Sequence, residues 1–151
     1  SDPSWSPDGN YLVYCKWDTV FGGYGLYRIR ADGAADSLLL KTMDSYSLMS
    51  PTWAAAGEAI TYEAQSPEHT LYRLDLASGS VSPVTSVGYD RWPAASYTGD
   101  TVAFTRAVFD TVKMYNIQEL NLVIGGSGPV VAITGFDGSM YASGPTWAGR
   151  P

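Results

Sequence analysis

The sequence is poor in the residues on which most hydrolytic and metal chemistry depends. Its 151 residues include one cysteine, Cys15, and one histidine, His69. A single cysteine excludes an internal disulfide, and the scarcity of Cys and His argues against a zinc site or a Ser-His-Asp triad. Because Cys15 lies in an apolar run, we expect a buried structural thiol. We expect His69 to cap a solvated loop, and we expect no catalytic residue, metal or cofactor.

Positive charge and long apolar runs are also scarce. Nine Lys and Arg stand against 15 Asp and Glu, which gives a net charge of −6. This balance excludes nucleic acid as the expected partner, because phosphate binding needs clustered cations. No apolar run is long enough for a membrane span. The chain opens at Ser1 without a methionine or a signal peptide, so we expect a processed chain or a piece of a longer protein.

Aromatic and turn-forming residues are abundant instead. The chain contains 11 Tyr, 5 Trp, 16 Gly and 9 Pro, and hydrophobic residues make up 45% of it. Many turns combined with many aromatic and β-branched residues indicate an all-β fold. No amphipathic stretch with a period of 3.6 residues interrupts this pattern.

A repeated stretch organises the chain. The segment from Pro3 to Gly9 (PSWSPDG) returns in weakened form at Pro51, Pro93 and Pro145, with spacings of 48, 42 and 52 residues. A period in the forties with a turn signature is typical of the four-stranded blade of a β-propeller. A single β-sandwich of about twelve strands is the alternative. The recurring Trp-x(3)-Gly phase, followed by an apolar strand, favours the propeller.

The predicted fold is therefore all-β: a partial β-propeller of about three four-stranded antiparallel blades plus the inner strand of a fourth. Residues 1–151 are expected to form a single propeller segment. The expected blades cover about 3–45, 51–86 and 93–135, and a fourth starts at 145–151. The expected inner strands are 3–6, 52–54, 94–97 and 146–148.

The first unit resembles the TolB-type propeller repeat. The resemblance rests on WSPDG (Trp5–Gly9), the strand from Tyr11 to Tyr14, the strand from Leu26 to Ile29, and Asp32-Gly33. It weakens in the second unit and again in the third. It implies a protein-interaction scaffold in the bacterial cell envelope, periplasmic or secreted. It also allows the propeller part of a larger peptidase or polysaccharide lyase, and it supplies no catalytic residue.

Three blades do not close a ring, so two blade faces are expected to stay open. The chain is then a piece of a longer protein, one half of a two-chain ring, or an open wedge. Two chains would bring eight inner strands to six positions. We therefore favour the piece, with a homodimer through the open blade faces as a second hypothesis.

The candidate binding surface is an aromatic-rich loop face. We expect six loops there, at 16–25, 43–50, 64–69, 86–92, 108–111 and 135–144. Arg91, between two aromatic residues, is the best single anchor, because Arg, Tyr and Trp dominate interface hot spots. Tyrosines that recur before the repeat prolines could serve in packing between strands and not in binding. Charged residues on this face, among them Asp90, are expected at solvated loop ends, with a polar rim around the binding surface as the alternative. The candidate site residues are Trp17, Phe21, Tyr24, Tyr46, Tyr89, Arg91, Trp92, Phe109 and Tyr141.

The expected function is thus a non-catalytic scaffold that binds a protein partner or a small polar ligand. The alternative is the propeller portion of a larger enzyme whose catalytic residues lie outside this chain.

Overall fold

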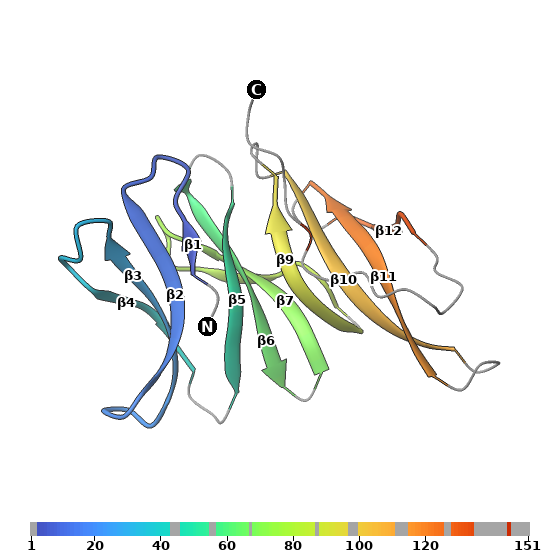
Figure 1. Ribbon diagram of the computed structural model, residues 1–151, viewed down its shortest axis with the longest axis horizontal. Coiled ribbons are helices and arrows are strands. Elements are labelled where there is room, and N and C mark those ends of the chain that lie inside the picture. Colours follow the sequence, from blue (N-terminus) through green and yellow to red (C-terminus); the bar gives the residue numbers. More distant parts are fainter. Residues whose placement is uncertain are drawn as a thin grey trace.

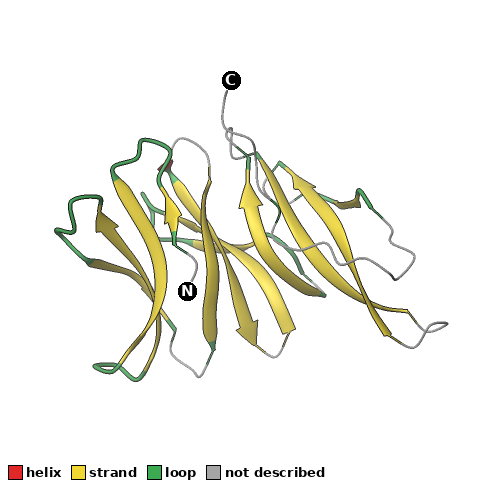
Figure 2. Ribbon diagram, in the orientation of Figure 1, coloured by secondary structure: helices red, strands yellow, loops and turns green. Residues whose placement is uncertain are grey.

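The computed structural model describes residues 3–42, 46–54, 57–66, 68–86, 88–96, 100–110, 115–125, 128–134 and 145. These residues form three antiparallel sheets that follow one another along the chain (Figure 1). Figure 2 shows that strands dominate and that turns and short loops connect them. The described residues include no helix long and apolar enough to cross a membrane.

Each sheet has four strands in sequence order. The first contains β1 (Ser4–Trp5), β2 (Tyr11–Asp18), β3 (Gly23–Arg30) and β4 (Ser37–Lys41). The second contains β5 (Ser47–Ala54), β6 (Ala59–Ser66), β7 (Glu68–Asp75) and β8 (Val81–Pro83). The third contains β9 (Tyr89–Ala95), β10 (Thr101–Asp110), β11 (Tyr115–Ile124) and β12 (Val130–Ala132).

The three sheets pack face to face about their first strands. Strand β5 contacts β1, β2 and β3 of the first sheet, and β9 contacts β5, β6 and β7 of the second. Four-stranded meanders arranged in this way are propeller blades. The predicted all-β fold of three antiparallel blades is confirmed, and a sandwich of two stacked sheets is excluded. The fourth inner strand expected at 146–148 lies outside the described residues.

The repeat tryptophan fastens one blade to the previous one. Trp5 pairs with Leu12 and Trp53 pairs with Ile60, so the two tryptophans hold equivalent places in their blades. The indole N–H of Trp53 donates a hydrogen bond of 3.1 Å to the carbonyl oxygen of Ser4. Trp53 is buried, whereas Trp5 is 56% exposed, because none of the described residues forms a blade in front of the first.

Two clusters of buried apolar side chains lie between the blades. The first cluster contains Val13, Cys15 and Leu26 from the first blade together with Leu48, Trp53, Ile60, Tyr62 and Leu74 from the second. The second contains Leu71 and Val84 together with Val102, Phe104 and Val123. Cys15 is 3% exposed, so the predicted buried thiol is confirmed. Each large buried side chain stabilises this packing by about 1.5–3 kcal/mol.

The inner strands begin earlier than the sequence predicted. Residues 47–50 and 89–92 were expected in loops but belong to β5 and β9. A β-bulge explains the difference: Ser50 and Trp92, each directly before a repeat proline, have φ angles of 46° and 50°, and the pairing register shifts there. The bulge accommodates a proline within the strand, because the proline has no N–H to donate to the ladder.

The second and third strands of each blade also extend into the expected loops. Trp17 and Tyr24 pair across β2 and β3, and β6, β7 and β10 reach Ser66, Glu68 and Asp110. The three glycines between residues 16 and 25 had indicated a loop, but Gly23 and Gly25 lie in β3. A Cβ on Gly25 would lie 2.6 Å from the Tyr27 ring and 2.9 Å from Leu38, so Gly25 is required for ring packing within a strand.

Candidate functional site

A cleft of about 500 Å³ lies on the third blade, and its outer side is not covered by any other described blade. Three members of the candidate set, all from β9, line it. Facing residues from β10 and β11 complete the lining. The lining residues are Tyr89, Arg91, Trp92, Thr105, Ala107 and Gln118.

The strand register explains why these side chains meet. Tyr89 pairs with Ala107 and Arg91 pairs with Thr105, while Ala107 also pairs with Gln118 on β11. Residues that are directly opposite in antiparallel strands point to the same face of the sheet. The methyl group of Ala107 therefore leaves open space between the longer side chains of Tyr89 and Gln118.

Arg91 is oriented by a buried pair from the second blade. Its Nη2 lies 2.8 Å from Nε2 of His69, and Nδ1 of His69 contacts the Glu63 carboxylate. A guanidinium only donates hydrogen bonds, so Nε2 is the acceptor, and the imidazole is neutral with its proton on Nδ1. His69 is 5% exposed and Glu63 is 2% exposed, so solvent does not compete for these bonds.

The expectation for His69 is therefore wrong. The sequence suggested a solvated loop end, but His69 lies in β7 and is buried between the second and third blades. The buried role of Glu63 was also missed, because in the sequence it looks like an ordinary polar position of an alternating strand. No sequence signal connects these two residues with Arg91, since the contact crosses between blades.

The charge of Arg91 has no ionic partner in the described part of the chain. The ion pairs found there involve Lys16, Arg30 and Arg106, the Glu63 carboxylate contacts neutral His69, and none of these contacts pairs Arg91 with a carboxylate. Beside it, Tyr89 is 48% exposed and its ring lies 5.6 Å from the His69 ring. The cleft thus presents a fixed cation and an accessible aromatic ring.

On the opposite face of β9, an ion pair anchors the same strand. Asp90, expected to be solvated, is fully buried and accepts two hydrogen bonds from Arg106, at 2.6 and 2.8 Å. These bonds raise the pKa of Arg106 above its ordinary value. The guanidinium also lies 5.5 Å from the centre of the Phe104 ring. Residues 90 and 91 therefore point to opposite faces, one structural and one facing the cleft.

The remaining candidates do not join this cleft. Trp17 and Tyr24 form an edge-to-face pair at 5.3 Å on the first blade, and Phe21 packs over Gly23 and Gly25 in the adjoining turn. Tyr46 precedes β5 and is 43% exposed. The side chain of Phe109 and all of Tyr141 lie outside the described residues.

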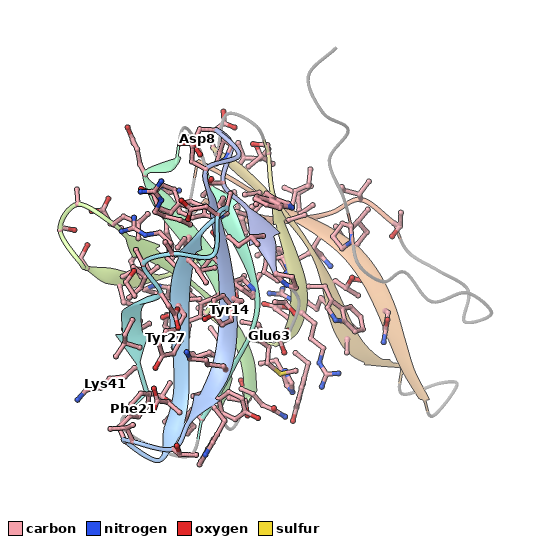
Figure 3. The ribbon with its side chains drawn as sticks, turned by 60° about the vertical axis from the view of Figure 1, so that its left-hand side comes forward. Asp8, Tyr14, Phe21, Tyr27, Lys41 and Glu63 are labelled. Carbon is pink, nitrogen blue, oxygen red and sulfur yellow. The ribbon has the colours of Figure 1, made fainter. Side chains whose placement is uncertain are left out.

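The first blade carries a second polar cluster, on the face away from the second blade. Figure 3 shows Tyr14 and Tyr27 side by side there. Lys16 lies over the Tyr27 ring at 3.8 Å and pairs with Asp36 at 2.8 Å, and this hydrogen bond raises the pKa of Lys16. The Tyr27 hydroxyl donates to Asp18, which raises the pKa of Tyr27 to about 12. The charges of this cluster are thus paired with one another.

A depression of about 530 Å³ lies beside the turns of the first blade. Charged groups that line it are also paired with neighbouring residues. Asp8, labelled in Figure 3, accepts hydrogen bonds from Ser6 and Asn10, which lower its pKa to about 2. Arg30 pairs with Asp32 at 3.0 Å. Within the described ranges, no group of three or more His, Cys, Asp or Glu is placed to hold a metal ion.

Four-stranded meanders packed about their inner strands define this chain as a β-propeller segment. No family model matches the chain, and no curated protein matches it. Among solved structures, the chain is similar to a putative TolB from Agrobacterium tumefaciens, with a TM-score of 0.69 and 20% identity over 87% of this chain and 47% of that one. The blades thus have the TolB-like propeller fold.

Two further similar structures come from proteins described as enzymes. A puromycin hydrolase matches with a TM-score of 0.68 and 22% identity over 97% of this chain and 23% of that one. The β-propeller domain of the Trilobed protease from Pyrococcus furiosus matches with 0.63 and 12% over 89% and 43%. The chain spans less than half the length of each of the three.

Proposed function

We propose that this chain is part of a TolB-like propeller that acts as a non-catalytic recognition scaffold, with the cleft on the third blade as its binding site. The observation that carries the proposal is the fixed position of the Arg91 guanidinium in the cleft. Its guanidinium is held by buried His69, lines the cleft, and has no ionic partner among the described residues. A fixed cation between aromatic side chains is typical of an interface anchor.

Long cationic side chains lose conformational freedom when they are fixed, by up to about 2 kcal/mol. The bond to neutral His69 fixes Arg91 without neutralising its charge. Such an arrangement lowers the stability of the fold but holds the side chain in one orientation. Binding is then favoured, because the side chain loses less conformational freedom when a ligand binds. The ligand class that we propose is a protein partner or a small polar molecule, in an extracytoplasmic location.

A second candidate function is the propeller portion of a larger hydrolase or lyase. It is favoured by the similarity to puromycin hydrolase and to the propeller domain of the Trilobed protease. In that case the cleft would help to admit or orient the substrate of a separate catalytic domain. A catalytic segment encoded next to this chain in its gene would favour this candidate.

A binding screen observed by NMR tests the scaffold. Small polar compounds and short peptides are added to the ¹⁵N-labelled chain, and changes in the indole signal of Trp92 are followed. We expect binders that shift this signal, compete with one another and weaken in the Arg91→Gln variant. Binders that shift only signals of the first blade, with Trp92 unchanged, would contradict the proposal.

Pairing of two copies through the open faces of the first and third blades stays a separate prediction. Sedimentation equilibrium tests it directly. A species of twice the chain mass that dissociates on dilution supports the dimer, and a monomer at all concentrations rules it out.

A further inference from the structure

Among the described residues, one buried hydroxyl group in the cleft has no hydrogen-bond partner. Thr105 is 2% exposed, and its Oγ1 bonds to none of the described residues. Buried polar groups are nearly always paired, so an unpaired one indicates a missing ligand or water. Thr105 lines the cleft as the cross-strand neighbour of Arg91, so the hydroxyl and the guanidinium lie on the same face.

Comparison of the blades shows which kind of group this site receives. Glu63 pairs with Met49 and Leu71, as Thr105 pairs with Arg91 and Leu120, so Thr105 occupies the place of Glu63. By the same register, Gln118 occupies the place of His69. In the second blade, His69 accepts a hydrogen bond from the Arg91 guanidinium, and Glu63 accepts one from His69.

In the third blade the two equivalent positions carry groups that can donate. A hydroxyl and a primary amide replace a carboxylate and an imidazole acceptor. With the guanidinium N–H groups of Arg91, the third blade therefore presents three kinds of donor to one cleft. The second-blade positions thus receive the Arg91 cation through His69, whereas the equivalent third-blade positions carry groups that can donate hydrogen bonds to an anion.

We propose that the cleft binds a carboxylate that is attached to an apolar or aromatic group. Arg91, Thr105 and Gln118 hold the carboxylate oxygens, and Tyr89 and Trp92 contact the attached group. This inference rests on the proposed function and specifies its ligand.

A monoanion fits better than a phosphate or a polyanion. The described lining of the cleft contains one cation, Arg91, and the buried carboxylate of Glu63 lies behind it, across His69. Phosphate sites usually combine several cations or a helix N-terminus, whereas one guanidinium matches one carboxylate. The net charge of −6 also disfavours highly charged anions.

The carboxylate can come from a small molecule or from the end of a polypeptide. The probes are 3-phenylpropionate, its neutral amide, an N-acetylated tripeptide ending in phenylalanine with a free carboxylate, and the C-terminal amide of that tripeptide. Each is titrated into the full chain, and the Trp92 indole and Arg91 side-chain signals are followed by ¹⁵N NMR. We expect both carboxylates to bind at least about tenfold more tightly than their amides. The tighter of the two identifies the source.

Substitution of Thr105 gives the sharpest test. Thr105→Val keeps the shape and removes the hydroxyl, and we expect it to weaken carboxylate binding about tenfold without lowering the unfolding temperature. Thr61 offers a matched control, since its buried hydroxyl also has no partner in the part of the chain that the structure describes, but it does not line the cleft. Thr61→Val is expected to leave binding unchanged.

The outcomes separate the two levels of the proposal. Amides that bind in the cleft as tightly as the carboxylates overturn the carboxylate assignment and leave the recognition scaffold standing. Equal effects of Thr105→Val and Thr61→Val on binding overturn the role of the hydroxyl, and with it the assigned site. If none of the probes shifts the Trp92 or Arg91 signals, because another part of the protein covers this face, the assignment is also overturned. The scaffold fails separately, when the wider screen finds no binder at Trp92.

Discussion

Replacing Asp90 by asparagine tests how the third blade holds the inner strand that carries the cleft. The Asp90 carboxylate is fully buried and accepts two hydrogen bonds from Arg106, whose side chain is 19% exposed. The two single variants are therefore not equivalent. Arg106→Gln leaves a buried charge without a counter-charge, whereas Asp90→Asn leaves a guanidinium that can still reach water.

The expected magnitudes follow from this asymmetry. Breaking a buried ion pair by removing one partner costs about 3–5 kcal/mol. We expect Arg106→Gln to lower the free energy of unfolding by about 4 kcal/mol. We expect Asp90→Asn to lower it by about 2 kcal/mol, because the guanidinium of Arg106 that it leaves is partly solvated. The double variant removes both charges, so we expect it to be more stable than the sum of the single effects by at least about 1.5 kcal/mol.

Urea denaturation followed by tryptophan fluorescence measures the four proteins of this cycle. A coupling free energy near zero would refute the reasoning, because it would mean that the two side chains do not interact in solution. An Asp90→Asn effect larger than that of Arg106→Gln would refute the asymmetry derived from burial.

Three further predictions concern the first blade. Gly25→Ala should destabilise the chain by about 1–3 kcal/mol through overpacking, because its Cβ would meet the Tyr27 ring; unchanged urea denaturation would argue against this contact. The pKa of Tyr27 is raised to about 12, so its stabilisation is present below pH 10 and lost as the pH rises to about 12. Burial also raises the pKa of Tyr62 and of Tyr14, so the absorbance at 295 nm should show several late-titrating tyrosines, one fewer in Tyr27→Phe. The pKa of Asp8 is lowered to about 2, so its contribution is present above pH 4 and lost as the pH falls toward 2. Asp8→Ala should remove that acid dependence, and an identical acid profile would contradict the prediction.

The blade architecture could be predicted from the sequence because it depends on local signals. The turn at Pro7–Asn10 has its glycine at φ 71°, and a repeated tryptophan marks each of the first two inner strands. Strand ends were less predictable. Pro51 and Pro93 lie inside strands because a bulge precedes each of them, and Gly25 lies inside a strand because an aromatic ring covers it.

The candidate site could be predicted only in part. Tyr89, Arg91 and Trp92 lie within four consecutive residues, so the sequence alone indicated a binding anchor there. The residues that orient and complete the site come from other strands and, for His69 and Glu63, from another blade. Their roles depend on strand register and on packing between blades, which one sequence does not reveal.

The most direct test of this account is the protonation pattern of its single histidine. Long-range ¹H–¹⁵N NMR of the full chain reports which ring nitrogen of His69 carries the proton. We predict a neutral ring with the proton on Nδ1, and an Nε2 signal that shifts in the Arg91→Gln variant because its donor has been removed. A proton on Nε2, with a spectrum that is the same in both proteins, would contradict the contact between blades on which the cleft depends.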